Sequence, residues 1–370
     1  MKDVIVIGGG LAGLVNAILL NRAGISVKLF EEKEYPFHRV CGEYISNEVI
    51  PFLKSNDLFP DQLQPSPITQ FQLSAISGKL LEMPLDLGGF GISRYAFDRW
   101  LAEIAIREGV EIIYERIVNV ESESETLIAG AKDGTNHEAN IIIGAFGKRS
   151  TLDKRLDRDF LTRRSPYIGV KYHIKTDLMA DDLIALHNFH NGYCGVSRVE
   201  NNTFNLCYLS SRDNLRKHGS VEKMEQHVLM KNPFLKDLFS EAEFLFEKPQ
   251  VINEITFEKK EPVFNHVLMS GDAAGMITPL CGNGMAMAIH SAKLLSELII
   301  ENYDSGFNRQ KLEKDYAKIW NDQFANRLKA GRSIQKLFGS KIISNSAISI
   351  ARSFSPLANF LMRQTHGQPF

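Results

Sequence analysis

Runs of apolar residues predict several buried strands in this chain, and the first run, residues 4–7, leads directly into a glycine-rich turn. Residues 11–23 then predict an apolar helix, and residues 25–30 alternate as a second strand. Two later continuous runs, residues 140–145 and 266–270, suit strands that are covered on both faces. This order of elements predicts an α/β domain built on a parallel sheet.

Strict alternation of apolar and polar residues marks a second kind of strand. Residues 68–76 and 79–85 alternate on either side of Ser77-Gly78, which predicts a hairpin, and alternation resumes over residues 167–175 and 183–212. These segments predict an antiparallel sheet that is interleaved with the first domain. The expected organisation is a nucleotide-binding domain of residues 1–56, 92–165 and 262–300, a substrate domain of residues 57–91 and 166–261, and C-terminal helices over residues 301–370. We also expect strands at residues 111–120 and helices at residues 47–55 and 344–362.

The first turn carries glycines at the spacing of a dinucleotide-binding turn: Gly8, Gly10 and Gly13. In such a turn the glycines serve a tight bend, the approach of a pyrophosphate and close helix packing, and the pyrophosphate lies at the helix N-terminus, beside Leu11 and Ala12. Glu31 ends the second strand, where a carboxylate can accept a ribose hydroxyl. The alternative is a glycine-rich strand–helix turn that binds no ligand.

Charge is nearly balanced over the 370 residues, with a formal net charge of -1, so the composition offers no electrostatic argument for binding nucleic acid. The balance is uneven, however, because residues 323–370 hold no Asp or Glu. Their seven cations are Arg327, Lys329, Arg332, Lys336, Lys341, Arg352 and Arg363. Apolar residues lie between these cations, so the segment predicts either peripheral contact with an anionic membrane or a helical cap over the substrate domain.

The beginning of the chain and its cysteines give an expectation of location. Residues 1–3 lead directly into the first strand, which leaves no room for a signal peptide, and no apolar run reaches the length of a membrane span. We therefore expect a cytoplasmic protein. The four cysteines show no CxxC spacing, so neither a metal site nor a disulfide framework is expected.

Three separated segments together resemble one flavoprotein superfamily, which contains p-hydroxybenzoate hydroxylase and geranylgeranyl reductase. These segments are the glycine turn, Gly271-Asp272 and the stretch from Pro279 to Gly284. The resemblance implies that FAD is the cofactor, that Asp272 bonds its ribityl chain, and that Pro279, Gly282, Asn283 and Gly284 pass beside the flavin ring. It also implies that Arg94, in an Arg-x-x-Phe-Asp pattern, lies near the cofactor. Arg39, in the loop after the second strand, is a further candidate for cofactor binding. The fold expected is thus an FAD-binding Rossmann-like domain, with GxGxxG and a later Gly-Asp motif, interleaved with an antiparallel substrate domain and followed by C-terminal helices.

Within the superfamily, Pro36-x-x-x-x-Cys41-Gly42 resembles the loop of geranylgeranyl reductases, in which the cysteine lies near flavin and substrate. The resemblance makes Cys41 the leading catalytic candidate, followed by Tyr44, His38 and Glu43; the alternative for Cys41 is a small buried thiol. Tyr193 and Arg198 are expected to contact the substrate, although only the tyrosine of the family's Tyr-x-Trp-x-Phe-Pro stretch is kept.

Two differences from other members of the superfamily bear on the expected reaction. Most hydroxylases of the superfamily carry an Asp where this chain has Phe146, and that Asp helps to bind both FAD and the nicotinamide donor. A phenylalanine cannot accept a hydrogen bond, so reduction by NAD(P)H is expected to be slow or to use other residues. Flavin halogenases of the superfamily need a Trp-x-Trp stretch, but Trp100 and Trp320 are the only tryptophans here, so halogenation is set aside.

The sequence therefore predicts an FAD-dependent oxidoreductase with an apolar or aromatic small-molecule substrate. The leading reaction is reduction of a carbon–carbon double bond in a lipid-like substrate; the alternative is hydroxylation of an aromatic or polyketide-derived substrate. A non-catalytic FAD-binding module is the third hypothesis. The electron donor stays open between NAD(P)H and a separate donor protein.

Overall fold

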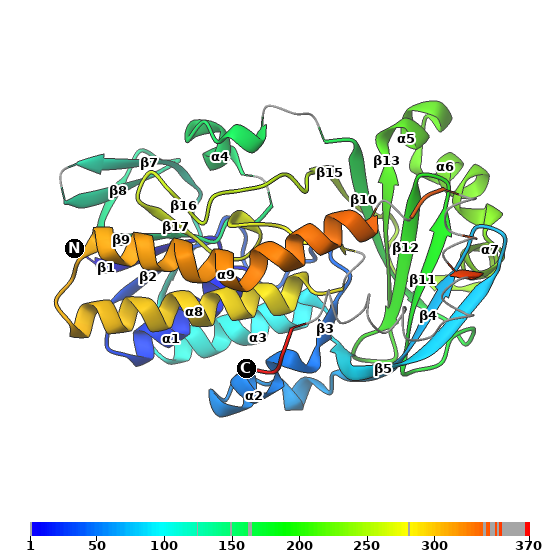
Figure 1. Cartoon of the computed structure of the whole chain (residues 1–370), viewed down its shortest axis with the longest axis horizontal. Helices are drawn as coiled ribbons and strands as arrows, with labels where there is room; N and C mark the ends of the chain where they lie inside the picture. The colour runs from blue at the N-terminus through cyan, green and yellow to red at the C-terminus, as the bar shows by residue number, and fades with distance from the viewer. Residues whose placement is uncertain are drawn as a thin grey trace.

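Two β-sheets lie side by side along the length of the molecule, with helices packed on the first and around the end of the second (Figure 1). The computed structural model describes residues 2–123, 125–148, 150–161, 165–279, 282–335, 338–340, 345, 348–349 and 367–370, without the side chains of Lys2 and Glu254. The long helix α9 (Arg309–Gln335) runs from the first sheet toward the second. We call the region between the two sheets the junction.

The first sheet is built around β1 (Lys2–Ile7), which pairs in parallel with both β2 (Val27–Phe30) and β9 (Asn136–Gly144). The other strands of this sheet are β6 (Glu111–Ile113), β7 (Ile117–Glu123), β8 (Thr126–Ala131), β16 (Val263–Phe264) and β17 (Val267–Met269). Val4 to Ile7 are buried on both faces, which explains why the sequence there is continuously apolar rather than alternating. All parallel strands end at the junction, where the loops that follow them meet.

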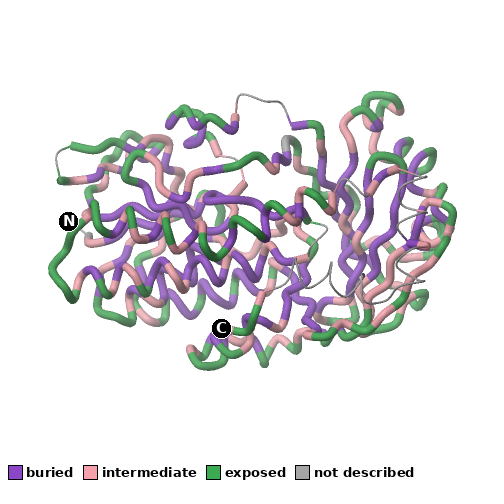
Figure 2. The backbone as a smooth tube through the Cα atoms, viewed as in Figure 1, coloured by how far each residue is buried: buried purple, intermediate pink, exposed green. Residues whose placement is uncertain are grey.

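Helices bury the first sheet from one side. α1 (Leu11–Arg22) packs against α3 (Arg94–Arg107) and α8 (Gly284–Asp304), and α8 packs against α9. The core strands and the inner faces of these helices are the most deeply buried parts of this half (Figure 2). Because α1 is apolar on nearly every side, it must lie between other elements.

The second sheet is mainly antiparallel, as the alternation predicts. Its strands are β3 (Tyr44–Ser46), β4 (Ser66–Ser74), β5 (Leu80–Gly91), β10 (Tyr167–Lys175), β11 (Leu183–Phe189), β12 (Gly192–Arg198), β13 (Phe204–Ser211), β14 (Glu243–Phe244) and β15 (Gln250–Ile255). One face is covered by the helices α5 (Arg212–His218), α6 (Val221–His227) and α7 (Pro233–Glu241). The opposite face looks into the junction.

Some elements differ from the sequence expectations. The strand expected over residues 111–120 is split, because β6 pairs with β2 whereas β7 pairs with β8. The helix expected at residues 47–55 begins with a 3₁₀ turn, Asn47–Val49, and continues as α2 (Ile50–Ser55). β3 lies within the range assigned to the nucleotide-binding domain, yet it pairs with β5 of the second sheet. The short helix α4 (Thr151–Arg155) begins with Ser150 as a capping box.

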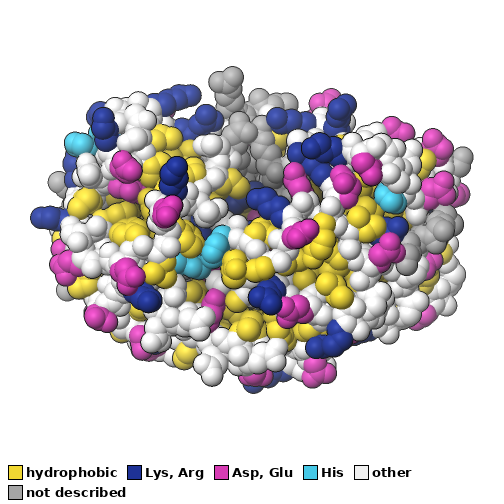
Figure 3. Space-filling view, turned by 180° about the vertical axis from the view of Figure 1, so that it is seen from behind, with side chains coloured by type: hydrophobic (Ala, Val, Ile, Leu, Met, Phe, Trp, Pro, Cys, Tyr) yellow, Lys and Arg dark blue, Asp and Glu magenta, His cyan; other side chains and the backbone are white. Residues whose placement is uncertain are grey.

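Acidic, basic and hydrophobic side chains are interspersed on the face opposite to that of Figure 1, in keeping with the near-neutral charge (Figure 3). Among the helices of the described residues, none combines the length and the apolarity that a membrane span requires. Most of the helix expected at residues 344–362 lies outside the described residues.

Candidate active site

A cavity of about 910 Å³ occupies the junction of the two sheets. It extends from the glycine turn after β1, past the loop that carries Cys41, to the inner face of the second sheet. The wall at the second sheet is mostly aliphatic and aromatic; its members include Phe71, Leu73, Leu81, Met83, Leu85, Ile184, Leu186, Leu209, Ile252 and Ile255. A cavity of this size, with an apolar end and a polar end, is typical of a site for a cofactor together with an organic substrate.

The glycine turn shows why three glycines are needed. A Cβ atom on Gly13 would lie 1.9 Å from the carbonyl oxygen of Gly8, and one on Gly8 would lie 2.5 Å from that of Ala145. Gly10 differs, because the nearest atom to a Cβ there would be Nη2 of Arg94 at 3.2 Å. Gly8 and Gly13 therefore permit close backbone packing, whereas Gly10 leaves open space in the cavity beside Leu11 and Ala12.

Charged side chains link the acid at the end of β2 to α3. Glu31 accepts hydrogen bonds from the Gly9 N–H (3.0 Å) and from Nη2 of Arg39 (2.9 Å). Arg39 also contacts Asp98 through Nε at 3.0 Å, and Asp98 pairs with Arg94 at 2.6 Å. Asp98 was not selected as a site residue from the sequence, although its position four residues after Arg94 is the spacing of an ion pair on one helix face.

Two buried cations hold the segment that contains Asp272. Residues 271–273 form a 3₁₀ turn after β17, and Asp272 lines the cavity. Nζ of Lys260 donates to the carbonyls of Asp272 and Lys148, each at 2.7 Å, and Nη1 of Arg158 donates to the Ala273 carbonyl at 3.0 Å. Burial lowers the pKa of Lys260 to about 8, against the opposing effects of Asp153 and Asp272. Neither Lys260 nor Arg158 belongs to a local sequence motif, because each donates to the carbonyl of a residue more than ten positions away.

The segment from Pro279 to Gly284 borders the cavity where α8 begins, although residues 280–281 lie outside the described part. Gly282 has a φ of 63°, and a Cβ there would lie 2.9 Å from the ring of Tyr44. Asn283 donates to Glu48 at 3.5 Å. Gly284 is the first residue of α8.

Glu48 connects this segment to residues far along the chain. Its buried carboxylate accepts a hydrogen bond from Nη2 of Arg327 at 3.0 Å, and the Gly367 N–H donates to it as well. The ring of Phe370 stacks on His290 with a centroid distance of 3.8 Å. Residues 367–370 thus pack behind the segment that borders the cavity, beside α8 (Figure 1).

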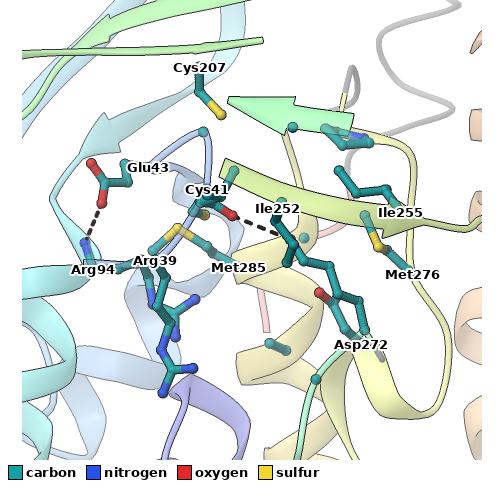
Figure 4. Close-up of a pocket in the computed structure, with 18 of the residues that line it drawn as sticks. Arg39, Cys41, Glu43, Arg94, Cys207, Ile252, Ile255, Asp272, Met276 and Met285 are labelled. Carbon is teal, nitrogen blue, oxygen red and sulfur yellow. Dashed lines mark hydrogen bonds between the residues drawn. The ribbon is translucent and has the colours of Figure 1, made fainter. Parts of the chain in front are cut away.

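The loop with Cys41 is fixed by Glu43. Cys41, Cys207, Glu43 and Arg94 all lie around this part of the cavity, and the Arg94 N–H donates to Glu43 (Figure 4) at 2.8 Å. Glu43 is fully buried, and it also accepts hydrogen bonds from Nζ of Lys171 (2.5 Å) and Nε2 of His173 (2.7 Å) on β10. Burial alone raises the pKa of Glu43, but the Lys171 ammonium and the His173 hydrogen bond outweigh it, so the pKa lies below its ordinary value.

The other two catalytic candidates border the same cavity. His38 stacks on Tyr95 with a centroid distance of 4.6 Å, and burial together with Lys171 and His173 lowers its pKa to about 4. His38 is therefore uncharged at neutral pH. The Tyr44 hydroxyl donates to the Gly88 carbonyl at 3.4 Å, and burial raises the pKa of this phenol.

The two residues expected to contact substrate differ in position. Tyr193 lines the cavity and packs edge-on against Phe338 at a centroid distance of 5.7 Å. Arg198 does not line it, because its guanidinium pairs with Asp181 and Asn202 at the end of β12. The structure therefore does not bring Arg198 to the cavity that Tyr193 lines. Phe146 borders the cavity in the loop after β9.

The polar end of the cavity fits FAD. Gly10 leaves space at the first turn of α1, and neither α1 nor α8 has a side-chain cap at the N-terminus that borders the cavity. Uncapped helix N-termini favour anionic groups such as a pyrophosphate. Glu31 and Asp272 both line this cavity, and a carboxylate can accept a hydrogen bond from a sugar hydroxyl.

Comparisons with known proteins give the same cofactor. The family model described as FAD binding domain matches residues 1–56. Digeranylgeranylglycerophospholipid reductase 1 of Methanopyrus kandleri is 25% identical over 361 residues, which cover 90% of this chain and 90% of the reductase. The 2,6-dihydroxypyridine 3-monooxygenase of Paenarthrobacter nicotinovorans is 23% identical, over 90% of this chain and 93% of that enzyme.

The chain is an FAD-dependent oxidoreductase. Its relatives are consistent with the p-hydroxybenzoate hydroxylase and geranylgeranyl reductase superfamily that its sequence resembles. The prediction of FAD as cofactor is confirmed, as is the mixed α/β fold. The flavin-dependent brominase Bmp2 is similar in structure, with a TM-score of 0.79 at 18% identity over 98% of this chain and 93% of the brominase. At this identity the likeness concerns the fold alone. The relatives of this flavoprotein include both reductases and monooxygenases, so its reaction has to be argued from the site.

Proposed function

We propose that this flavoprotein reduces a carbon–carbon double bond in an apolar, lipid-like substrate that lies against the second sheet. The observation that carries the proposal is the apolar wall of the cavity, which faces the loop with Cys41 at the junction. Burying such a wall against a hydrocarbon is favourable by about 25 cal/mol for each Å² removed from water. The relatives named as geranylgeranyl-type reductases support the same class of substrate.

Named residues would hold the cofactor. We assign the pyrophosphate to the turn of Gly8, Gly10 and Gly13, a ribose hydroxyl to Glu31 and the ribityl chain to Asp272, because these groups border the polar end of the cavity or shape it. FAD supplies the hydride equivalent when it is bound and reduced. The chain itself must then provide a proton and exclude water.

Cys41 is our candidate for the proton donor. It lies in the cavity between the polar end and the apolar wall, and its carbonyl accepts a hydrogen bond from Asn205, which fixes the loop to β13. Uncharged His38 is a poor acid at neutral pH, and the Tyr44 hydroxyl is directed at a backbone carbonyl. A thiol beside the substrate can donate a proton and regain it from water between turnovers.

Hydroxylation of a ring is the second candidate function. The relatives named as monooxygenases favour it, and Tyr193 offers an aromatic surface against which a ring can pack.

Either reaction needs an electron donor that reduces the flavin. Phe146 provides no acceptor for a nicotinamide, so we propose a separate donor protein or another set of contacts.

The C-terminal segment was expected either to contact a membrane or to form a helical cap over the substrate domain. Arg327, one of its seven cations, is engaged by Glu48. Phe338 packs on Tyr193, and Ile348 is buried and lines the cavity. These described residues favour the helical cap over the substrate sheet, whereas most of the other cations and apolar residues lie outside the described part of the chain.

The experiment is to incubate the reduced holoprotein with a lipid extract, without and with oxygen, and to follow products by mass spectrometry. Reduction predicts a gain of two hydrogens that needs no oxygen, and hydroxylation predicts a gain of one oxygen. Cys41→Ala should lower the first product while keeping the flavin content. Cys194→Ala is the matched control, because Cys194 is buried in the other face of the second sheet.

A further inference from the structure

A glycine interrupts the wall of the cavity in the middle of the second sheet. Gly195 belongs to β12, which lies between β11 and β13, and it pairs with Leu186 on one side and Cys207 on the other. Both partners line the cavity, as do Tyr193 and Ser197, the residues two positions before and after Gly195 on β12. Gly195 therefore faces the cavity, while Cys194 and Val196 are buried in the opposite core.

The protein itself does not require a glycine at this position. Gly195 is not among the residues with positive φ. A Cβ there would lie 3.4 Å from Cδ2 of Leu186 and 3.7 Å from the Cys207 carbonyl oxygen, which are ordinary contacts. In other strands of the sheet, a Cβ on Gly91, Gly192 or Gly169 would lie within 3 Å of a neighbouring atom, so these glycines are explained by packing.

The missing side chain has a cost and a consequence. Glycine inside a strand loses more conformational entropy on folding than other residues do, and it offers no side chain to pack. Its effect at Gly195 is to deepen the cavity between Leu186 and Cys207. Cys207 lies close to Cys41, and burial raises the pKa of the Cys207 thiol to about 12, so this side of the cavity presents an uncharged thiol.

We propose that Gly195 is a specificity-determining residue, whose missing side chain admits a group as wide as a ring next to the reacting end of the substrate. The substrate class is then an apolar molecule that carries a ring near Cys41 and Cys207, rather than an unbranched chain alone. The inference rests on the proposed function in one respect, namely that the apolar end of the cavity holds the substrate. It does not depend on whether that substrate is reduced or hydroxylated.

The test measures binding in the oxidised holoprotein, through the change in the flavin absorption spectrum when a probe enters the cavity. The probes are 2-naphthol, which is a flat ring system, and geranylgeraniol, which is a chain. Gly195→Val and the smaller Gly195→Ala fill the space by different amounts. Gly130→Val is the matched control: Gly130 lies in β8 outside the cavity lining, and its nearest contact would also be at 3.4 Å.

We expect 2-naphthol to bind the parent and to lose roughly tenfold in affinity in Gly195→Val, about 1.4 kcal/mol, with a smaller loss in Gly195→Ala. Geranylgeraniol should bind both variants nearly as well as the parent, and Gly130→Val should behave as the parent. Equal affinity of 2-naphthol for the parent and both Gly195 variants would overturn the proposal, as would a parent that binds geranylgeraniol but no ring. Because no turnover is needed, a failed search for a reduced product would count against the proposed function alone.

Discussion

Nζ of Lys171 donates a hydrogen bond to the carboxylate of Glu43 at 2.5 Å, and neither side chain is exposed to solvent. The pair joins β10 of the second sheet to the loop that carries Cys41, and the Arg94 N–H extends the connection to α3. Charges in such a place are stable only together, because each would otherwise be buried without a partner.

Glu43→Gln should therefore destabilise the fold by about 3–5 kcal/mol, since it leaves the Lys171 ammonium buried without a counter-ion. Urea unfolding of the holoprotein measures the loss, and the double variant Glu43→Gln/Lys171→Met should regain part of it.

The contribution of Glu43 to stability also depends on pH. Its pKa is lower in the folded state than its ordinary value of 4.5, so the stabilisation is complete above that value and is lost as pH falls through the folded pKa. If Glu43→Gln were as stable as the parent, Glu43 would not be the counter-ion that stabilises the buried Lys171.

Lys260→Met should weaken FAD binding by roughly tenfold, about 1.4 kcal/mol, because the carbonyls of Asp272 and Lys148 lose their shared donor. Fluorescence titration of the apoprotein with FAD measures the affinity. Lys259→Met is the control, since the neighbouring lysine is exposed. If both variants bound FAD as the parent does, Lys260 would have no part in holding this segment.

Gly10→Val should abolish FAD binding and leave the fold intact. The nearest atom to a new Cβ is the flexible guanidinium of Arg94 at 3.2 Å, so the side chain is accommodated, but it takes the space assigned to the pyrophosphate. Flavin content after purification and thermal unfolding of the apoprotein give the two readouts. If the purified variant were yellow, it would still bind FAD, and the assignment of the pyrophosphate to this turn would be wrong.

Phe146→Asp should speed reduction of the flavin by NADPH or NADH, because it supplies a hydrogen-bond acceptor in the loop after β9. Stopped-flow absorbance under anaerobic conditions measures the rate, and Phe146→Leu, which adds no acceptor, should match the parent. Fast reduction of the parent itself would show that other residues hold the nicotinamide.

Glu225→Gln should remove a pH-dependent part of the stability. Burial raises the pKa of Glu225 from 4.5 to about 7, although Tyr172 and Tyr208 both donate hydrogen bonds to its Oε1. A folded pKa above the unfolded one gives stability that is complete below pH 4.5 and is lost as pH rises toward 7, by about 3 kcal/mol at 1.36 kcal/mol per pKa unit. Thermal melts between pH 5 and pH 8 should show this slope in the parent and not in the variant. The same slope in both proteins would exclude Glu225 as its source.

The sequence by itself determined the first strand, the glycine turn and the class of cofactor. These features are local: a buried parallel strand must be continuously apolar, and the turn after it needs glycine where a Cβ would meet backbone, as at Gly13. The hairpin of β4 and β5 follows in the same way from alternation around Ser77-Gly78. Asp272 and the segment to Gly284 were found by resemblance, and both border the cavity.

Only the tertiary structure decided which distant side chains complete the site. Lys171 is 128 residues from Glu43, and Arg327 is 279 residues from Glu48, so no local pattern joins either pair. Arg198 is the opposite case. It lies next to a substrate motif in the sequence, but its side chain pairs with Asp181 and Asn202 outside the cavity. The room beside Gly195 also depends on the strands to either side, since the space left by a missing side chain is set by its neighbours in the sheet and not by its neighbours in the chain.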